Sequence, residues 1–490
     1  MPACQSGMNK APSSARSAEA VIPPGMGFAY ALPVVPLLLL MHSLNVVQGI
    51  YAEHYGLALT TISAVMFFAG LFDAVTDLAI GHWSDRVKRR TGNRRVFVAV
   101  GAAAAVPCAW FLFVPDGHVG VAYFMFWYIA FYLSVTLFMI PHFALGGELS
   151  SNSAERTKAY GFRTLGTYAG ITLYYLIPLT PFFTTGEITP ETMRTSILAS
   201  AVLMVPCLLI FLKRVPPGVA DSAQPRSGEA PWSVLMALSS NRPLLIYLLA
   251  FLMFSLGMGV FYGLMFIVID SWLDLGGYFP QLMLFHLAVA TLMLRPAIWL
   301  SNRIGKRRTW AVAAGLQVCC LPFVLLLLGG GSGSLGLLFV LQFFLGASSS
   351  MGNVSTPSLF MDVIDYDRLK SGHDRTATFF SLRSFLEKVS TTTIGFPLGG
   401  AIIGLYGYDP AQPEWTERAL FGFSLAMGWL PTIIAAAAVG LIFLIPLNQR
   451  RRAIIRRRLD RRDKRMSPAA AQGLGDHSAN AMNPAEPRHA

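Results

Sequence analysis

The chain consists of long apolar segments separated by short polar ones. Each apolar segment is long enough to cross about 30 Å of hydrocarbon as a helix. We count twelve such segments: 25–49, 58–81, 96–115, 119–142, 160–179, 195–212, 243–269, 278–300, 309–328, 335–357, 377–405 and 420–446. The pattern predicts an all-α membrane protein with twelve transmembrane helices.

The longest polar interruption, residues 213–241, is rich in proline, glycine and serine and falls between the sixth and seventh apolar segments. It predicts a cytoplasmic linker between two pseudo-symmetric halves of six helices each, 25–212 and 242–446. A short polar segment, 1–24, precedes the first half, and a basic one, 447–490, follows the second. We expect the former to be a disordered tail and both to be cytoplasmic.

Charge is scarce and unevenly placed. Only 13% of the residues are charged and 54% are hydrophobic, whereas about a quarter of a soluble domain is charged. Arginine and lysine gather after the second and eighth apolar segments and in the C-terminal tail, while the loops on the opposite side carry more acids. By the positive-inside rule both termini are cytoplasmic, which predicts a multi-pass protein of the cell inner membrane. The net charge of +12 then reflects topology and attraction to anionic lipid, not nucleic-acid binding.

The polar segments after the second and eighth apolar segments are related to each other. Both resemble the loop signature Gly-x-x-x-Asp-Arg-x-Gly-Arg-Arg of the major facilitator superfamily. The first copy contains Asp85 and Arg86 but has Lys88 in place of the later glycine. The second has Ile298 at the leading glycine and Asn302 for the aspartate. We assign a gating and structural role to Asp85 and Arg86, because the two halves of such transporters alternate about a central site.

Two carboxylates lie inside the second apolar segment. Inserting Asp73 and Asp77 into a membrane costs about 2.5–3.5 kcal/mol each on insertion scales. Four residues apart on a helix, they share one face with Cβ atoms roughly 5–6 Å apart. Two anions this close in a low dielectric require a cation between them or a proton on one of them. The spacing therefore indicates a site for a coupling cation; the alternative is a structural pair neutralised by a neighbouring arginine.

Three stretches, in order along the chain, resemble the glycoside–pentoside–hexuronide:cation symporters, the family of the melibiose permease. The first is Phe72–Arg86, which contains Phe-Asp-Ala-x-x-Asp-x-x-x-Gly-x-x-x-Asp-Arg. The second runs from Ile140-Pro141 to Arg163 and the third from Asp362 to Lys388. The resemblance implies the major facilitator fold and cation-coupled transport of a small solute, with no catalytic residue and no cofactor besides the coupling ion, Na⁺ or H⁺.

The resemblance also assigns roles. It implies that Asp73, Asp77 and Thr136 hold the cation, with Thr76 at the position where the family has an asparagine that helps to bind sodium. Lys388 matches a lysine that links the cation site to the substrate cavity. We expect its ammonium group to replace the cation between the two acids, although a lysine can also extend to the membrane interface.

The sequence departs from the family at the sugar site. Arg163 matches an arginine near the substrate, but the aspartates that hold sugar hydroxyls in melibiose-type members are replaced by Leu37 and Met139. Arg383 and Glu387 lie one turn apart on the eleventh apolar segment. They either pair with each other or provide an additional cation for an anionic substrate.

Few polar residues are left to bind a sugar in the first apolar segment. His42, Asn45 and Gln48 are spaced by three, and we consider substrate contact and interhelical hydrogen bonding equally. At the end of the tenth segment, Asp362 and Asp365 lie near Arg368, which favours a salt-bridged cytoplasmic gate over a metal site.

Three functions remain open from the sequence. The first is symport of a glycoside, pentoside or hexuronide with Na⁺ or H⁺ by alternating access. The second is cation-coupled transport of an anionic or amphiphilic solute such as a lysolipid. The third is a membrane assembly or sensing factor that has lost transport. The buried acids and lysine argue against the third, because a scaffold has no use for buried charge. The expected partners are a small solute and the bilayer, with no nucleic acid and no metal beyond the coupling cation, and we expect the protein to work as a monomer.

Overall fold

The computed structural model describes residues 21–115, 119–150, 153–217, 241–327, 334–372, 376–408 and 416–447, together with 451, 454–455 and 457–459. Within these ranges the regular secondary structure is entirely helical, and all twelve predicted apolar segments coincide with helices. The predicted all-α fold is therefore confirmed. Most of the predicted tails and of the linker 213–241 lies outside the described residues.

The longest apolar helices are suited to cross a membrane. Among the described residues, nine helices are long and apolar enough, and a tenth span is formed if Gly276–Leu292 and Leu294–Ile304, which meet at a 45° bend, are taken together. The fifth and eleventh predicted spans, α7 (Ser153–Leu176) and α16 (Thr376–Lys388) with the segments after it, are more polar. These two helices carry several of the charged residues to which the sequence assigns a function.

By its contacts the chain divides into two compact units. The first comprises Met1–Ile50 and Leu71–Pro225, and the second Tyr51–Gly70 and Arg226–Ala490. Tyr51–Gly70, which the sequence assigns to the N-terminal half, belongs to the second unit by its contacts. As a result, α4 (Leu59–Thr91) contributes to both units.

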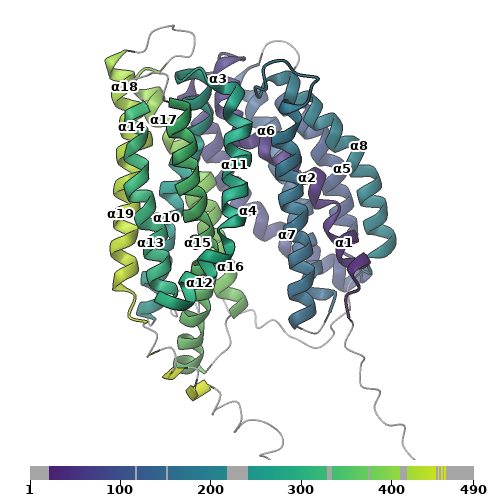
Figure 1. The fold of residues 1–490 in the computed structure, drawn as a ribbon. Coiled ribbons are helices and arrows are strands. Elements are labelled where there is room, and N and C mark those ends of the chain that lie inside the picture. Colours follow the sequence, from purple (N-terminus) through teal and green to yellow (C-terminus); the bar gives the residue numbers. More distant parts are fainter. Residues whose placement is uncertain are drawn as a thin grey trace, which may run out of the picture. The chain divides into compact units, whose positions relative to one another are not determined.

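The helices of the first unit besides α4 and α7 are α1 (Pro24–Ala31), α2 (Val34–Met41), η1 (His42–Asn45), α5 (Arg95–Phe113), α6 (Val121–Glu148), η2 (Ile177–Leu179) and α8 (Pro190–Arg214), with α3 (Val47–Glu53) at its boundary. α5 packs along α6 and α8, and α2 along α7 and α8 (Figure 1). Gly101 permits the close contact of α5 with α6, since a Cβ there would lie 2.5 Å from the backbone nitrogen of Phe138. This contact fixes the part of α6 that carries Thr136.

The second unit contains, besides α16, the helices α10 (Arg242–Ile267), η3 (Val268–Trp272), η4 (Gly276–Tyr278), α11 (Phe279–Leu292), α12 (Leu294–Ile304), α13 (Lys306–Cys320), η5 (Leu321–Phe323), α14 (Val324–Leu327), α15 (Ser334–Ser371), η6 (Val389–Gly395), α17 (Phe396–Leu405), α18 (Glu417–Phe423), η7 (Ser424–Trp429) and α19 (Leu430–Leu444). α10 packs along α19 and η6, and α15 along α13 and α11. The aromatic core of the unit is built on Tyr247, whose ring centroid lies 4.8 Å from that of Phe360 and 5.3 Å from that of Trp310.

Two helices extend further than the apolar pattern predicted. α4 continues ten residues past 81 and α15 fourteen past 357, so Asp85 and Asp362 lie on helices, not in loops. Both helices end at a glycine with positive φ, Gly92 at 69° and Gly372 at 81°. Their amide groups donate to the carbonyls of residues four positions earlier. The chain thus stays helical until a glycine allows the left-handed conformation of a C-terminal cap.

The first span is interrupted, which corrects the single helix predicted over 25–49. Pro33 separates α1 from α2, and a 3₁₀ segment, η1, follows before α3. A proline inside a helix removes one backbone hydrogen bond, which explains the first break. Three segments of the second unit, η3, η6 and η7, are π-helical.

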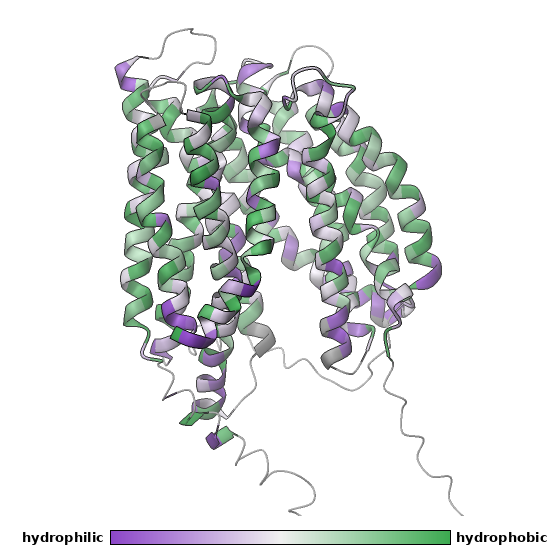
Figure 2. Cartoon of the chain, viewed as in Figure 1, coloured by the Kyte–Doolittle hydropathy of each residue, from purple (hydrophilic) through white to green (hydrophobic). Residues whose placement is uncertain are grey.

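Apolar side chains cover much of the surface of both units. Figure 2 shows apolar residues along the length of the helices and polar residues gathered near many of their ends. Phe68, Val202 and Phe443 are examples of large apolar side chains that are more than half exposed. Such a surface is expected where helices face lipid.

Candidate functional site

The predicted cation site lies on α4 and α6 in the first unit. The carboxylate of Asp73 is buried, and its Oδ1 accepts a hydrogen bond of 2.9 Å from the hydroxyl of Thr136. Thr136 comes from α6, five residues before Pro141, and is itself buried. A predicted acid and a predicted hydroxyl, 63 residues apart in the chain, are therefore in direct contact. This is the strongest convergence among the predicted site residues.

The other two predicted cation ligands lie beside Asp73 on α4. Asp77 is half-buried one turn further along the helix. The hydroxyl of Thr76 donates to the backbone carbonyl of Asp73 at 3.0 Å, so it is directed to its own helix and not to a carboxylate. Two hydroxyls of α6, those of Tyr128 and Tyr132, are 3.5 Å apart and lie close enough to Asp73 to interact with it electrostatically. The sequence reasoning did not include these two tyrosines.

The predicted polar row of the first span is divided between two segments. His42 and Asn45 lie on η1, where three residues make one turn and side chains three apart are aligned. Gln48 lies on α3, after the break at Val46, and is buried. The Nδ1 of His42 donates 3.0 Å to the carbonyl of Leu38, so part of its polarity is satisfied within its own segment.

The guanidinium group of Arg163, on α7, faces a sulfur atom and an aromatic ring. Its Nη2 donates to the Sδ of Met139 at 3.4 Å, and its Cζ lies 5.5 Å from the centroid of the Phe143 ring. Among the ion pairs formed by the described residues, none includes Arg163. A partly buried cation with a sulfur atom and an aromatic ring beside it is a suitable partner for an external anion.

Arg383, Glu387 and Lys388 follow one another on α16 in the second unit. Arg383 pairs with Glu387 at 3.7 Å, and its Cζ lies 4.2 Å from the centroid of the Phe251 ring. The predicted pairing is therefore present, with Glu387 about half exposed. Lys388 is half-buried at the junction of α16 with the π-helical η6. Since Lys388 belongs to a different unit from Asp73, its exchange with the cation stays a prediction.

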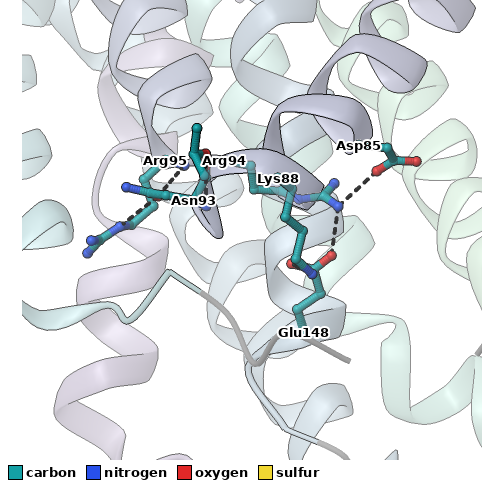
Figure 3. A network of polar contacts seen from close by, with 7 residues as sticks. Asp85, Lys88, Asn93, Arg94, Arg95 and Glu148 are labelled. Carbon is teal, nitrogen blue, oxygen red and sulfur yellow. Dashed lines mark hydrogen bonds and ion pairs between the residues drawn. The ribbon is translucent and has the colours of Figure 1, made fainter. Parts of the chain in front are cut away.

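Of the two gate residues predicted in the first unit, Asp85 belongs to a network of ion pairs that is drawn in Figure 3. Glu148, at the end of α6, pairs with Lys88 at 2.7 Å and with Arg94 at 2.8 Å. Arg94 also pairs with Asp85 at 2.8 Å. Lys88, which departs from the family signature, thus has a structural role: its ammonium group adds a second cation to Glu148. Arg86 lies outside this network, on the exposed side of α4 beside a cavity of about 620 Å³.

The second unit has a similar but smaller connection. Lys306 pairs with Asp362 at 2.8 Å and also donates to the backbone carbonyl of Ser358 at 2.8 Å. Both acceptors belong to α15, and Lys306 begins α13. Asp365 and Arg368 lie on the same stretch of α15. In each unit, then, ion pairs connect the start of the helix after the signature-like segment with the C-terminal part of the fourth or tenth predicted span.

Two histidine clusters were not predicted, one around the buried His142 and one around the partly buried His286. In the first unit, His142 stacks on Tyr30 with ring centroids 4.3 Å apart and donates from Nε2 to the carbonyl of Tyr30 at 2.9 Å. In the second, His286 bonds Gln342 at 3.0 Å and Ser349 at 3.4 Å. Isolated histidines, glutamines and serines in apolar segments give no sequence signal, because their partners come from other helices.

No group of three or more histidine, cysteine, aspartate or glutamate side chains suited to a metal occurs in the part of the chain that the structure describes. That Asp73, Asp77 and the Thr136 hydroxyl hold a single monovalent cation stays a prediction. Carboxylate and hydroxyl oxygens are hard ligands, which suit Na⁺ and also allow a proton to be carried.

Comparison with known proteins places this arrangement in a family. The sequence model of the family described as MFS/sugar transport protein matches residues 23–449. The chain belongs to this family. It is therefore a multi-pass membrane transporter with the all-α major facilitator fold and not an enzyme, and the predicted resemblance to glycoside–cation symporters is confirmed.

Individual relatives differ in what their names say they transport. The chain is 25% identical over 431 residues to the sodium-dependent lysophosphatidylcholine symporter 1 of Homo sapiens, covering 80% of this chain and 77% of the relative. It is 24% identical to the uncharacterized symporter YjmB of Bacillus subtilis, and the match covers 83% of this chain and 88% of the relative. It is 23% identical to the lactose permease of Lactobacillus helveticus, and the match covers 80% of this chain and 63% of the relative. These relatives support symport of a solute without identifying it.

Solved structures agree on the fold. A bacterial homolog of the human lysosomal transporter Spinster has a TM-score of 0.63 at 13% identity, with 86% of this chain and 95% of that chain covered. The nucleoside transporter NupG has a TM-score of 0.58 at 12% identity, with 86% and 98% covered. Identities this low establish the architecture and leave the substrate open.

Proposed function

We propose that this transporter is a symporter that couples the movement of a solute with an anionic group to the entry of Na⁺. The observation that carries the coupling is the contact of the Thr136 hydroxyl with the buried carboxylate of Asp73. A buried carboxylate inside a membrane is costly, and a bound cation offsets that cost. Asp77, one turn away, supplies the second carboxylate.

The composition of the site favours Na⁺ over H⁺. A proton needs only one carboxylate oxygen, whereas Na⁺ requires several oxygen ligands, and the Thr136 hydroxyl offers one that does not titrate. The relatives named sodium-dependent lysophosphatidylcholine symporters support the same choice. Uptake into membrane vesicles should respond to an imposed Na⁺ gradient at constant pH. A response to a pH gradient alone, with Na⁺ absent, would make H⁺ the coupling ion.

Arg163 supports an anionic group on the solute. Its guanidinium group lies beside the sulfur of Met139, at a position where the resemblance expects a sugar-binding aspartate. Leu37, the other replaced aspartate, is fully buried and apolar. A neutral sugar would therefore lose two charge-assisted hydrogen bonds of roughly 1.5–3 kcal/mol each. A carboxylate or phosphate would instead gain a partner in Arg163.

A glycoside is the second candidate, because the family description names sugar transport and one relative is a lactose permease. Transport by the purified protein in liposomes distinguishes the two. The panel should contain a neutral galactoside, an anionic hexuronate and a lysophospholipid, each with an inward Na⁺ gradient. Efficient uptake of the galactoside, without uptake of the hexuronate or the lysophospholipid, would show that the protein transports neutral sugars.

Arg163→Gln tests the role of the guanidinium group directly. Arg156→Gln is the matched control, since Arg156 is an exposed arginine on the same helix. We expect Arg163→Gln to weaken solute binding at least about tenfold, the equivalent of 1.4 kcal/mol, while Na⁺ binding changes little. Arg156→Gln should behave as the unmodified protein. Equal effects of both changes would indicate a general effect of charge and not a solute contact.

We also infer that both termini are cytoplasmic in the cell inner membrane, on the distribution of arginine and lysine. Cysteines introduced at Gly186 and at Ser222 should be labelled from opposite sides of the membrane. Labelling of both from the same side would overturn the topology.

A further inference from the structure

A cavity of about 400 Å³ lies in the second unit, apart from the predicted cation and solute residues. It is formed where α10 begins and where α15 and α19 end, together with helical residues that follow α19. The volume is within the range of about 300–1,000 Å³ typical of ligand sites. All of these elements belong to one unit, so the cavity does not depend on the placement of the other.

Three arginines line the cavity: Arg242 at the start of α10, and Arg451 and Arg458 from the segment after α19. None of the described residues that line it is acidic. Arg451 donates 2.9 Å to the carbonyl of Pro446, and this hydrogen bond holds its side chain at the rim of the cavity. Among the ion pairs of the described residues, none includes Arg242 or Arg458.

The rest of the lining is mainly apolar. Leu369 of α15, Leu447 and Ile455 contribute to it, and Ile454, about half exposed, lies on its outer side. Ile455 and Leu459, four residues apart, pack into the hydrophobic core of the unit. This packing explains why the helical residues after α19 contact the rest of the unit. It does not explain why three arginines line the same apolar cavity.

We propose that this cavity binds an anionic phospholipid of the cytoplasmic leaflet. The arginines would hold the phosphate of the headgroup, and the leucine and isoleucine side chains would contact the beginning of the acyl chains. Charge complementarity selects this occupant, since a phosphate joined to an apolar chain matches both parts of the lining. Basic pockets at the cytoplasmic ends of transmembrane helices are suited to such headgroups. The proposal rests on the predicted orientation and not on the identity of the transported solute.

The test uses the purified full-length protein and native mass spectrometry, with three probes: phosphatidylglycerol, phosphatidylcholine with the same acyl chains, and glycerol phosphate. We expect phosphatidylglycerol to bind at least about tenfold more tightly than the other two, since only it combines a net negative headgroup with acyl chains. Equal binding of phosphatidylcholine would overturn the selection by charge. Equal binding of glycerol phosphate would show that the cavity recognises phosphate without acyl chains, which contradicts a phospholipid site.

Neighbouring arginines provide a matched pair of variants. Arg458 lines the cavity, whereas Arg457, also helical and exposed, does not. Arg458→Gln should weaken phosphatidylglycerol binding about five- to tenfold, while Arg457→Gln should change it less than about twofold. Equal losses in both would mean that the basic tail attracts anionic lipid without a defined site, which contradicts the proposal. Thermal unfolding of both variants, expected to match the unmodified protein, confirms that neither change disturbs the fold.

Discussion

Replacing Asp73 by asparagine removes one negative charge from the predicted cation site and little else. The amide oxygen of asparagine still accepts the hydrogen bond that Thr136 donates at 2.9 Å. The side chain is 1% exposed, so the charged form bears a desolvation cost that the amide avoids. We therefore expect Asp73→Asn to insert and fold with a melting temperature equal to or higher than that of the unmodified protein.

Cation binding should change in the opposite direction. A charge-assisted contact contributes about 1.5–3 kcal/mol, which corresponds to a roughly 10- to 150-fold loss of Na⁺ affinity. Isothermal calorimetry on the purified protein measures this loss, and uptake into energised vesicles should show no accumulation above equilibrium. Accumulation at the normal ratio in Asp73→Asn would refute the assignment of the coupling site to this carboxylate.

Two threonines refine the same experiment. Thr136→Val removes the hydroxyl that contacts Asp73, whereas Thr76→Val removes one that bonds the helix backbone. We expect the former to weaken Na⁺ binding about three- to tenfold and the latter less than about twofold, because a hydroxyl contact contributes about 1 kcal/mol. A larger loss in Thr76→Val would transfer the ligand role to that residue, as the family resemblance implies.

Three further changes test other parts of the structure. Glu148→Gln should lower the free energy of unfolding by about 1–3 kcal/mol, because it breaks two partly buried ion pairs; an unchanged melting temperature in detergent would contradict this. The Lys158 side chain and then the Ile22 amide group hold the pKa of Glu155 below its ordinary value. The stabilisation that these contacts give the folded state is therefore present above the unfolded-state pKa of Glu155 and is lost as the pH falls through its folded-state pKa. Proteolysis just before Ile22 should thus increase in acid, and Glu155→Gln should show the same increase at neutral pH. Gly259→Val should prevent folding or activity, measured by yield and uptake, since a Cβ there would lie 2.5 Å from the Thr391 carbonyl oxygen; Gly315→Val, where nothing lies within 4 Å, is the control.

The spans were predictable because lipid imposes a strong pattern. Residues that face hydrocarbon must be apolar over about 20 positions, and each predicted segment is helical. The ends of the helices were less predictable, because α4 and α15 stay helical for several residues beyond their apolar segments. Gly92 and Gly372 mark the true ends, and a search for glycine after the basic residues would have found both.

Within the site, predictability depended on whether a residue is unusual for a membrane. The carboxylates of Asp73 and Asp77 stand out in an apolar segment and could be found individually, whereas Arg163 was assigned through the family resemblance. Thr136 was identified only through the family resemblance, since a threonine in a helix is common. The partners of His286 come from other helices, so their contact depends on packing that a sequence pattern does not encode. For the same reason the role of Lys88 became clear only from its distance to Glu148.

The π-helical segment η6 begins directly after Lys388 and gives that side chain a means of reorientation. A π turn holds one residue more than an α turn, and the surplus can shift along a helix by exchanging neighbouring hydrogen bonds. Moving it past Lys388 would rotate the lysine by about 100°, one residue's share of a helical turn, while the ends of the span stay in place. Deleting Thr392 should remove the surplus and fix the lysine in one direction. If the Lys388 ammonium group must reach both the cation and the solute, the deletion should leave the binding of either the cation or the solute intact and abolish coupled uptake. Normal coupled uptake would show that the extra residue of the π turn is not needed.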